Sequence, residues 1–204
     1  SAAIDAGNPL FVPPPTTDQR GLPRVIRGRL DMGAVEVNQV LPTLVATGAG
    51  SGGSAVVTAI DPTGTQSAPF NAFPGFTGGV RVATADVTGD GILDYIVGAG
   101  PGGAPIVQIF DGNGLGVVAS FAAFEGSFSG GVYVAAGDIN GDGFADIVVT
   151  PDQGGGPVVA VYSGFAASTG VATELIPRYF GIQDPAFRGG ARAAVGDVNG
   201  DGVP

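Results

Sequence analysis

The chain has 204 residues, of which 44% are hydrophobic and 13% charged, and its formal net charge is −10. It contains no cysteine and no histidine, which excludes disulfides, thiol chemistry and every catalytic or zinc site built on histidine. The acidic charge opposes binding to nucleic acid, and no apolar stretch approaches the ~20 residues of a membrane-spanning helix. We therefore expect neither nucleic-acid binding nor membrane insertion.

The N-terminal residues 1–23 are rich in proline, including Pro13, Pro14 and Pro15, and are predicted to form an extended leader or linker. An arginine cluster overlaps the end of this segment and comprises Arg20, Arg24, Arg27 and Arg29. We expect a solvated arm here, and docking of the cluster on an acidic neighbouring surface is the alternative.

Residues 24–204 repeat themselves. Three segments begin with Phe-x-Gly-Gly, at Phe76, Phe128 and Phe187, and each runs into an acidic loop. An earlier copy without an acidic loop is visible from Thr43, where TLVATGAGSGGSAVVTAIDPTG parallels YIVGAGPGGAPIVQIFDGNG. We divide the region into repeats 24–75, 76–127 and 128–186 and a partial repeat 187–204. The third repeat is longer, and its extra residues are predicted to lengthen a hairpin.

The pattern inside each repeat predicts β-strands. Short segments rich in valine, isoleucine and alanine are separated by many of the 38 glycines and 16 prolines, and few windows have helical periodicity. Four short antiparallel strands per repeat of about 50 residues are typical of a β-propeller blade. The sequence thus predicts an all-β fold with about three to four blades, an incomplete propeller. We expect further blades beyond Pro204, or another copy of the chain, to cover the open edges.

Two complete acidic loops have the same spacing of oxygen-bearing residues. They are Asp86-x-Thr88-x-Asp90-Gly91-x-x-Asp94 and Asp138-x-Asn140-x-Asp142-Gly143-x-x-Asp146. Oxygen ligands at positions 1, 3 and 5 followed by glycine are typical of calcium loops, and calcium takes six to eight oxygens. Position 9 is aspartate and no glutamate follows at position 12, so each loop is predicted to join two strands rather than two helices.

We therefore predict calcium (Ca²⁺) as the bound ion, held by side chains at positions 1, 3, 5 and 9 and by the carbonyl at position 7. The expected ligands are Asp86, Thr88, Asp90, Ile92 and Asp94 in the first loop, Asp138, Asn140, Asp142, Phe144 and Asp146 in the second, and Asp197, Asn199 and Asp201 in a third, partial loop. Thr88 brings only a neutral hydroxyl, so we expect the first site to be weaker.

An alternative interpretation is that these residues only form tight turns, for which Asp, Asn and Gly are preferred. Repetition of the loop in register with the surrounding repeat favours the metal. Three carboxylates held together without a cation would repel one another. Because the unfolded chain has no formed site, the ion is predicted to stabilise the fold.

The Phe-x-Gly-Gly motif, the acidic loop and the Gly-Ala-Gly-Pro turn together resemble FG-GAP repeats, also called VCBS-type repeats in bacterial proteins. The resemblance covers roughly residues 43–204. It departs at Thr150-Pro151-Asp152, which replaces the Gly-Ala-Gly of Gly48–Gly50 and Gly98–Gly100. Such repeats are the blades of the integrin α-subunit propeller and of many secreted bacterial proteins. The resemblance implies calcium in the hairpin loops between the first two strands of each blade.

By the same resemblance we expect a secreted or cell-surface module of bacterial type that binds a protein or glycan ligand in adhesion. The alternatives are a structural cell-surface or filament-forming repeat protein, and a non-catalytic propeller within a larger secreted enzyme. No enzymatic activity is expected of this chain, because its only glutamates, Glu36, Glu125 and Glu174, have no spacing that pairs them with a catalytic carboxylate. We expect Tyr133, Tyr162, Tyr179, Phe70, Phe121 and Phe180 to lie between blades, and sugar stacking by the tyrosines is the alternative.

Overall fold

The computed structural model describes residues 25–26, 29–30, 44–198 and 204. Residues 1–23 and most of the arginine cluster therefore lie outside the described residues. The elements in chain order are β1 (Val25–Ile26), β2 (Arg29–Leu30), β3 (Val45–Gly48), β4 (Val56–Ile60), β5 (Phe70–Asn71), β6 (Val80–Ala85), β7 (Asp94–Ala99), β8 (Ile106–Phe110), β9 (Val117–Ala122), β10 (Val132–Gly137), β11 (Asp146–Pro151), β12 (Val158–Tyr162), α1 (Gly164–Ser168) and β13 (Glu174–Phe180).

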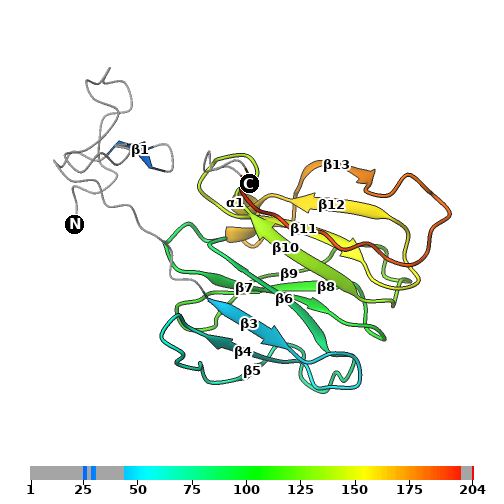
Figure 1. The fold of residues 1–204 in the computed structure, drawn as a ribbon, viewed down its shortest axis with the longest axis horizontal. Coiled ribbons are helices and arrows are strands. Elements are labelled where there is room, and N and C mark those ends of the chain that lie inside the picture. Colours follow the sequence, from blue (N-terminus) through cyan, green and yellow to red (C-terminus); the bar gives the residue numbers. More distant parts are fainter. Residues whose placement is uncertain (1–24, 27–28, 31–43, 199–203) are drawn as a thin grey trace.

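Three of the sheets are successive antiparallel meanders, and we call them blades 1, 2 and 3. Blade 1 contains β3–β4–β5, blade 2 contains β6–β7–β8–β9, and blade 3 contains β10–β11–β12–β13. The blades lie side by side in chain order, from blue-cyan through green to orange in Figure 1. The predicted all-β fold is confirmed, and four strands form in blades 2 and 3. Three strands of blade 1 fall within the described residues. The arrangement is consistent with neighbouring blades of an incomplete propeller.

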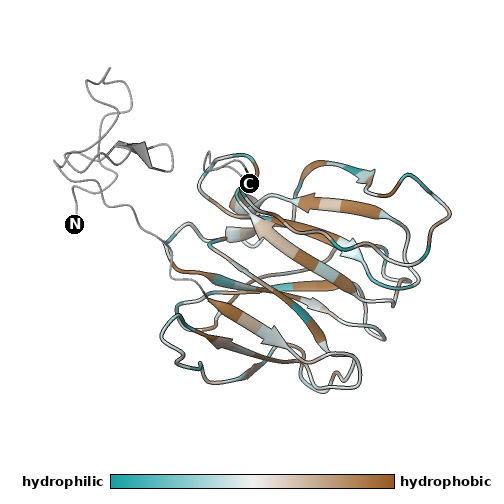
Figure 2. Cartoon of the chain, viewed as in Figure 1, coloured by the Kyte–Doolittle hydropathy of each residue, from teal (hydrophilic) through white to brown (hydrophobic). Residues whose placement is uncertain are grey.

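Each blade has two apolar faces, because alternate residues of a strand point to opposite sides of its sheet. On β7, Tyr95 and Val97 pack in the core shared with blade 1, whereas Ile96 between them packs in the core shared with blade 3. On β8, Val107 and Ile109 also face blade 3. Brown stretches accordingly alternate with white and teal ones along the strands in Figure 2. Full burial of each such side chain contributes about 1.5–3 kcal/mol, so most of the stabilisation lies between blades.

An aromatic ring from the last strand of one blade packs into the next blade. The ring centroids of Phe70 on β5 and Phe110 on β8 are 5.0 Å apart. Those of Phe121 on β9 and Tyr162 on β12 are 4.7 Å apart, and the Tyr162 hydroxyl donates a hydrogen bond to the carbonyl of Ala123 at 2.8 Å. The prediction that Phe70, Phe121 and Tyr162 lie between blades is confirmed.

In blade 3 the position equivalent to Phe70 and Phe121 is occupied by Tyr179. The prediction that Phe180 lies between blades as they do is wrong. The register shows this, since the equivalent cross-strand pairs are Phe70 with Val57, Phe121 with Val107 and Tyr179 with Val159. The connection before β13 is longer, and the pairing of β13 with β12 is irregular. The residue that lies at the equivalent place in the sheet is therefore one position earlier than the alignment of the repeats predicts. Tyr179 and Phe180 are 49% and 50% exposed.

The longer connection of the third repeat is not simply an extended hairpin. It contains α1, a single helical turn in which the Ser163 hydroxyl accepts a hydrogen bond from the amide of Ala166. Ala167 of this turn is fully buried in the core between blades 2 and 3. The insertion therefore contributes the Ala167 side chain to the core between blades 2 and 3. Among the residues that the structure describes, no helix is long and apolar enough to cross a membrane.

The Phe-x-Gly-Gly motif joins each blade to the one before it. The amide of Gly52 donates to Thr77, that of Gly102 to Ser129 and that of Gly154 to Arg188, at 3.1, 2.8 and 2.9 Å. The donors lie in the turns between β3 and β4, between β7 and β8, and between β11 and β12, and each acceptor lies in the motif that follows. The third bond reaches beyond blade 3, so the chain after β13 makes the same contact that begins blades 2 and 3.

The second glycine of the motif is required by two constraints. Gly131 has a φ of +86°, which side chains other than glycine rarely adopt. A Cβ atom there would also lie 2.5 Å from the carbonyl carbon of Gly100 in blade 2. The backbones of neighbouring blades approach closely at this point, and only glycine leaves room for the contact.

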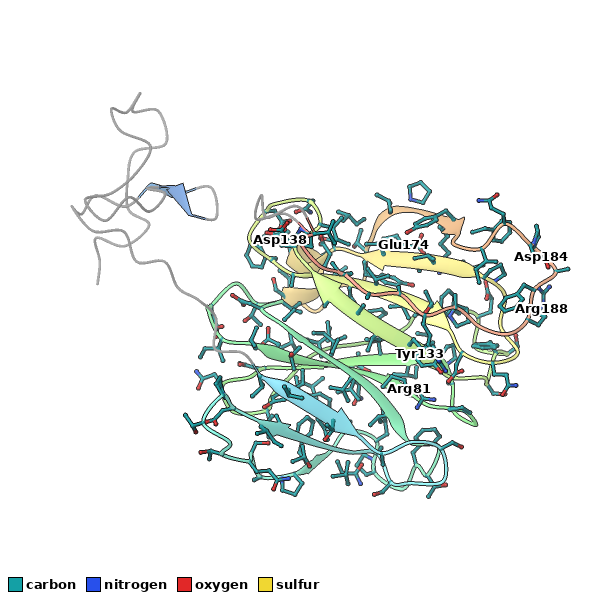
Figure 3. The ribbon with its side chains drawn as sticks, in the orientation of Figure 1. Arg81, Tyr133, Asp138, Glu174, Asp184 and Arg188 are labelled. Carbon is teal, nitrogen blue, oxygen red and sulfur yellow. The ribbon has the colours of Figure 1, made fainter. Side chains whose placement is uncertain are left out.

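The first strands of successive blades are linked by stacked charged and aromatic side chains. Tyr133 on β10 lies between two guanidinium groups, those of Arg81 on β6 at 5.0 Å and of Arg192 at 4.9 Å from its ring centroid. Arg81, which lies beside Tyr133 in Figure 3, also forms an ion pair of 2.9 Å with Asp152, the residue that follows β11. Tyr133 thus lies at a blade junction, as expected, although its neighbours are arginines.

Substituting Gly131 with alanine should test the blade contact, with Gly64→Ala as the control. Gly64 has the same φ of +86°, but a Cβ atom there would meet nothing within 4 Å. Both variants incur the left-handed strain of about 1–2 kcal/mol. Gly131→Ala should lose roughly 2 kcal/mol more, because packed backbone must also move. Denaturant unfolding measures the difference, and equal losses would contradict the interlocking role.

Candidate metal centre

Each acidic loop joins the first two strands of a blade, as predicted. The first loop connects β6 to β7 and the second connects β10 to β11. Asp94 and Asp146, at position 9, are the first residues of β7 and β11. The loops therefore lie at the same end of two adjacent blades, and a cavity of about 250 Å³ between them is lined by both position-1 residues, Asp86 and Asp138.

The carboxylate at position 1 shapes each loop by accepting backbone hydrogen bonds. In the first loop, Asp86 accepts from the amides three, four and five residues ahead, at 2.7, 3.2 and 2.9 Å. In the second loop, Asp138 accepts from the equivalent amides at 2.8, 3.0 and 2.8 Å. Asp86 is buried and Asp138 half-buried. The two loops thus have the same local fold although four of their nine residues differ.

The carboxylate at position 9 links the loop to the outer part of the blade. One oxygen of Asp94 accepts from the amides of Val87 and Thr88, and the other accepts from Gly112 in the turn after β8, all at 2.9 Å. Asp146 accepts in the same way from Ile139 at 3.0 Å and from Gly164 at 2.9 Å. Both aspartates are fully buried.

Burial is the largest influence on the charge of these two groups. It raises the pKa of Asp94 and that of Asp146 above the ordinary value for aspartate, and the backbone donors oppose this rise. The neighbouring Asp142 carboxylate raises the pKa of Asp146 further. A buried carboxylate of this kind is stabilised by hydrogen bonds and would be stabilised further by a nearby cation.

The glycines that bind position 9 were not predicted from the sequence. Gly112 and Gly164 each stand 18 residues after the aspartate that they bind. A Cβ atom at Gly112 would collide with the carbonyl of Leu93, and one at Gly164 with the carbonyl of Ala145. The signal available in the sequence was a glycine at the same separation in both repeats.

The side chains at position 5 of both loops, and Asn140 at position 3 of the second loop, are exposed. The Asp90 carboxylate accepts a hydrogen bond from the amide of Ile92, two residues ahead, at 2.8 Å. In the second loop, Asn140 and Asp142 bind each other, with the Asn140 amide donating to the Asp142 carboxylate at 3.0 Å. Among the described residues, no three acidic side chains converge as a preformed metal cluster. Asn199 and Asp201 of the third loop lie outside the described residues.

Neighbouring acidic loops contact each other. The amide of Ala145 in the second loop donates to the carbonyl of Asp86 in the first, at 2.8 Å. The ring of Phe144, at position 7, packs so closely on Gly89 that a Cβ atom there would lie 2.7 Å from it. Phe144 also makes an edge-on contact with Phe165 of α1, with centroids 5.2 Å apart. Ordering one loop would therefore also affect the blade beside it.

The donor chemistry of the loops fits calcium. Each loop offers hard oxygen atoms from side chains and carbonyls, and a carboxylate that accepts two or three backbone bonds retains lone pairs for a metal. The Thr88 hydroxyl at position 3 is buried beside the Asp94 carboxylate, where a weak interaction between the two lowers the pKa of Asp94. A cation bound in the loop would give this oxygen a stronger partner. The exposed side chains at position 5 would have to turn inward to join it.

A known protein family matches the part of the chain that contains both complete acidic loops. The family model described as an FG-GAP-like repeat matches residues 86–149, from the first acidic loop to the fourth residue of β11. This part of the chain is an FG-GAP-like repeat. The resemblance inferred from the sequence is confirmed over the region that holds both complete acidic loops. The FG-GAP-like repeat thus spans from the loop of one blade to the loop and second strand of the next.

Substituting Asp94 with alanine in metal-free buffer should destabilise the FG-GAP-like repeat strongly. The change removes one buried carboxylate and leaves the amides of Val87 and Gly112 without this acceptor, at a cost of about 3 kcal/mol or more. Asp111→Ala is the control, because the half-buried Asp111 accepts a hydrogen bond from the amide of Asn113 within a turn outside the acidic loops. That variant should lose about 0.5–1 kcal/mol. Equal losses in chemical denaturation would disprove the linking role of position 9.

Proposed function

We propose that this chain is a calcium-stabilised, extracellular β-propeller-like module that binds a protein or glycan ligand. The observation that supports it best is the pair of equivalent acidic loops at the same end of adjacent blades. Asp86, Thr88, Asp90, Asp94 and the carbonyl of Ile92 would hold one ion. Asp138, Asn140, Asp142, Asp146 and the carbonyl of Phe144 would hold a second, and the loop that begins at Asp197 a third.

Bound calcium would supply positive charge and a fixed coordination sphere to loops that are otherwise closed only by hydrogen bonds. The residues of the chain prepare for it in two ways. Position 1 holds the loop backbone in its turn, and position 9 attaches the loop to the outer turn of the same blade. The contacts of Phe144 and Ala145 then transmit the order of one loop to the neighbouring blade.

A recess in blade 3 supports ligand binding. A cavity of about 510 Å³ is bounded by the rings of Phe124, Phe128, Tyr179 and Phe180 and by Arg178. Ligand pockets of this size are commonly lined by aromatic side chains with a few polar groups that fix orientation. Aromatic faces suit the apolar side of a sugar ring or a side chain of a partner protein, so both ligand classes fit this recess.

The carboxylates beside the recess support a binding role rather than catalysis. Arg178 donates to Glu174 at 2.7 Å and lies 3.8 Å from Glu125. Its guanidinium also stacks on Phe124 at 5.2 Å. Both described glutamates thus neighbour one cation, which is typical of a structural charge cluster. We propose no reaction for this chain.

Calcium should raise the thermal stability of the chain, and a chelator should reverse the change. At a free calcium concentration 100-fold above the dissociation constant, one site adds about 2.7 kcal/mol to the free energy of unfolding. Asp142→Ala should reduce this increment, with Asp184→Ala as the control. Asp184 is an exposed aspartate outside the acidic loops. Like Asp142, it accepts a hydrogen bond from the backbone amide two residues ahead. Differential scanning calorimetry measures the shift.

Two outcomes of that experiment would refute the calcium proposal. One is a midpoint of unfolding that does not change between millimolar calcium and excess chelator. The other is an equal loss of the calcium increment in Asp142→Ala and Asp184→Ala, which would indicate a general effect of charge.

The recess should be tested with Phe180→Ala against Phe165→Ala. Both rings are at least half exposed, but Phe165 lies on α1 and does not line the recess. On a glycan array and in a pull-down with extracellular proteins, Phe180→Ala should weaken binding about tenfold, equivalent to about 1.4 kcal/mol. Phe165→Ala should bind as the unmodified chain does. Ligands that bind both variants equally would exclude this recess as the site.

A further inference from the structure

Blade 3 has an apolar face that no complete blade covers within the described residues. Val148, Val159 and Val161 form its floor, and Tyr179 and Ile176 stand at its outer side. Segment 191–196 lies across part of it and leaves a groove of about 520 Å³. Tyr179 and Ile176 are 49% and 41% exposed. In blades 1 and 2 the equivalent face is covered by the next blade in the chain.

Blade 1 has the complementary open face. Val45 on β3 pairs with Ile60 on β4, and both side chains point away from blade 2 with 58% and 42% exposure. The equivalent cross-strand pairs are Tyr95 with Phe110 in blade 2 and Ile147 with Tyr162 in blade 3. Each of those pairs is buried and includes the ring that receives Phe70 or Phe121 from the preceding blade.

We propose that a second copy of this chain docks its blade 1 on blade 3 of the first, so that Tyr179 packs against Val45 and Ile60 of the second copy. The contact continues the interface already formed twice within the chain. There the inserted ring and the receiving ring are 5.0 and 4.7 Å apart. A single chain presents both the inserting side chain and the receiving pair, and both are apolar and exposed. A second copy can therefore bind through the same kinds of surface that already join neighbouring blades within one chain.

The chain after β13 supports the same arrangement. The amide of Ala191 donates to the carbonyl of Pro151 at 3.1 Å, just as the amide of Val80 donates to Ala49 at 2.8 Å. Val195 packs on the face of blade 3. Segment 191–197 thus occupies the place of the first strand of a following blade. Among the described strands, β3 pairs with β4 alone, and in the proposed contact the other edge of β3 would pair with this segment of a second copy.

The proposed contact is head-to-tail, and two such contacts would close a ring of two chains. Each shared blade would take its first strand from segment 191–197 of one copy and its other three from β3, β4 and β5 of the other. This inference does not depend on the proposed ligand or on calcium.

The mass of the unmodified chain in solution tests the proposal directly. Light scattering coupled to size exclusion, with and without calcium, should give twice the chain mass of 19.9 kDa. Ile60→Asp and Tyr179→Asp should each reduce it to the mass of one chain, while Phe165→Asp, an exposed aromatic position elsewhere, should not. A single-chain mass for the unmodified protein, or an assembly larger than two chains, would overturn the closed pair.

Cross-linking then identifies the surfaces, and the absence of native cysteine makes the result specific. Ile60→Cys and Tyr179→Cys are prepared as separate proteins, mixed and treated with a short thiol-reactive cross-linker. A covalent product of two chains is expected from this mixture and not from Ile60→Cys mixed with Phe165→Cys. Equal products from both mixtures, or none from the first, would refute the docking of blade 1 on blade 3.

Discussion

The structure depends on the fact that every blade is apolar on both faces. A sheet such as blade 2 must bury Tyr95 and Val97 on one side and Ile96 and Val107 on the other, so it needs a neighbour on each side. Hydrophobic stabilisation is proportional to the apolar area removed from water, and a four-stranded sheet without neighbours would leave both of its apolar faces exposed. Stability therefore belongs to pairs of blades rather than to single ones.

The sequence predicts the features that depend on local conformation. Glycine and proline mark the turns, β-branched residues mark the strands, and the spacing of Asp86, Asp90 and Asp94 marks the loop between two strands. It does not predict features that depend on how distant segments meet. Arg81 and Asp152 are 71 residues apart, and only the order of the blades brings them to 2.9 Å. The repeat pattern aligned Phe180 with Phe70 and Phe121, but a pairing irregularity in β13 shifts the register by one residue and places Tyr179 at that position.

The acidic loops combine two demands that favour the same residue. Aspartate at positions 1 and 9 satisfies backbone amides that would otherwise be buried without partners, so these residues are needed even without metal. The side-chain oxygens at positions 3 and 5 contribute less to the fold of the loop. Asp90 and Asp142 at position 5 are exposed, and position 3 holds Thr88 or Asn140 instead of an acid. The positions that the fold needs least are therefore those where the proposed metal would account for the choice of residue.

Departures from the repeat distinguish one blade junction from the next. The first strands place Arg81, Tyr133 and Arg192 at the same position of successive blades, and the tyrosine stacks between the two arginines. Asp152 stands where the other blades have glycine, and it forms an ion pair with Arg81. Identical blades could pair in any order, since their apolar faces are interchangeable. A partly buried ion pair adds little stability but disfavours a wrong neighbour, because the charge would then be left unpaired. The repeated residues thus specify a blade, and the exceptions specify its place in the row.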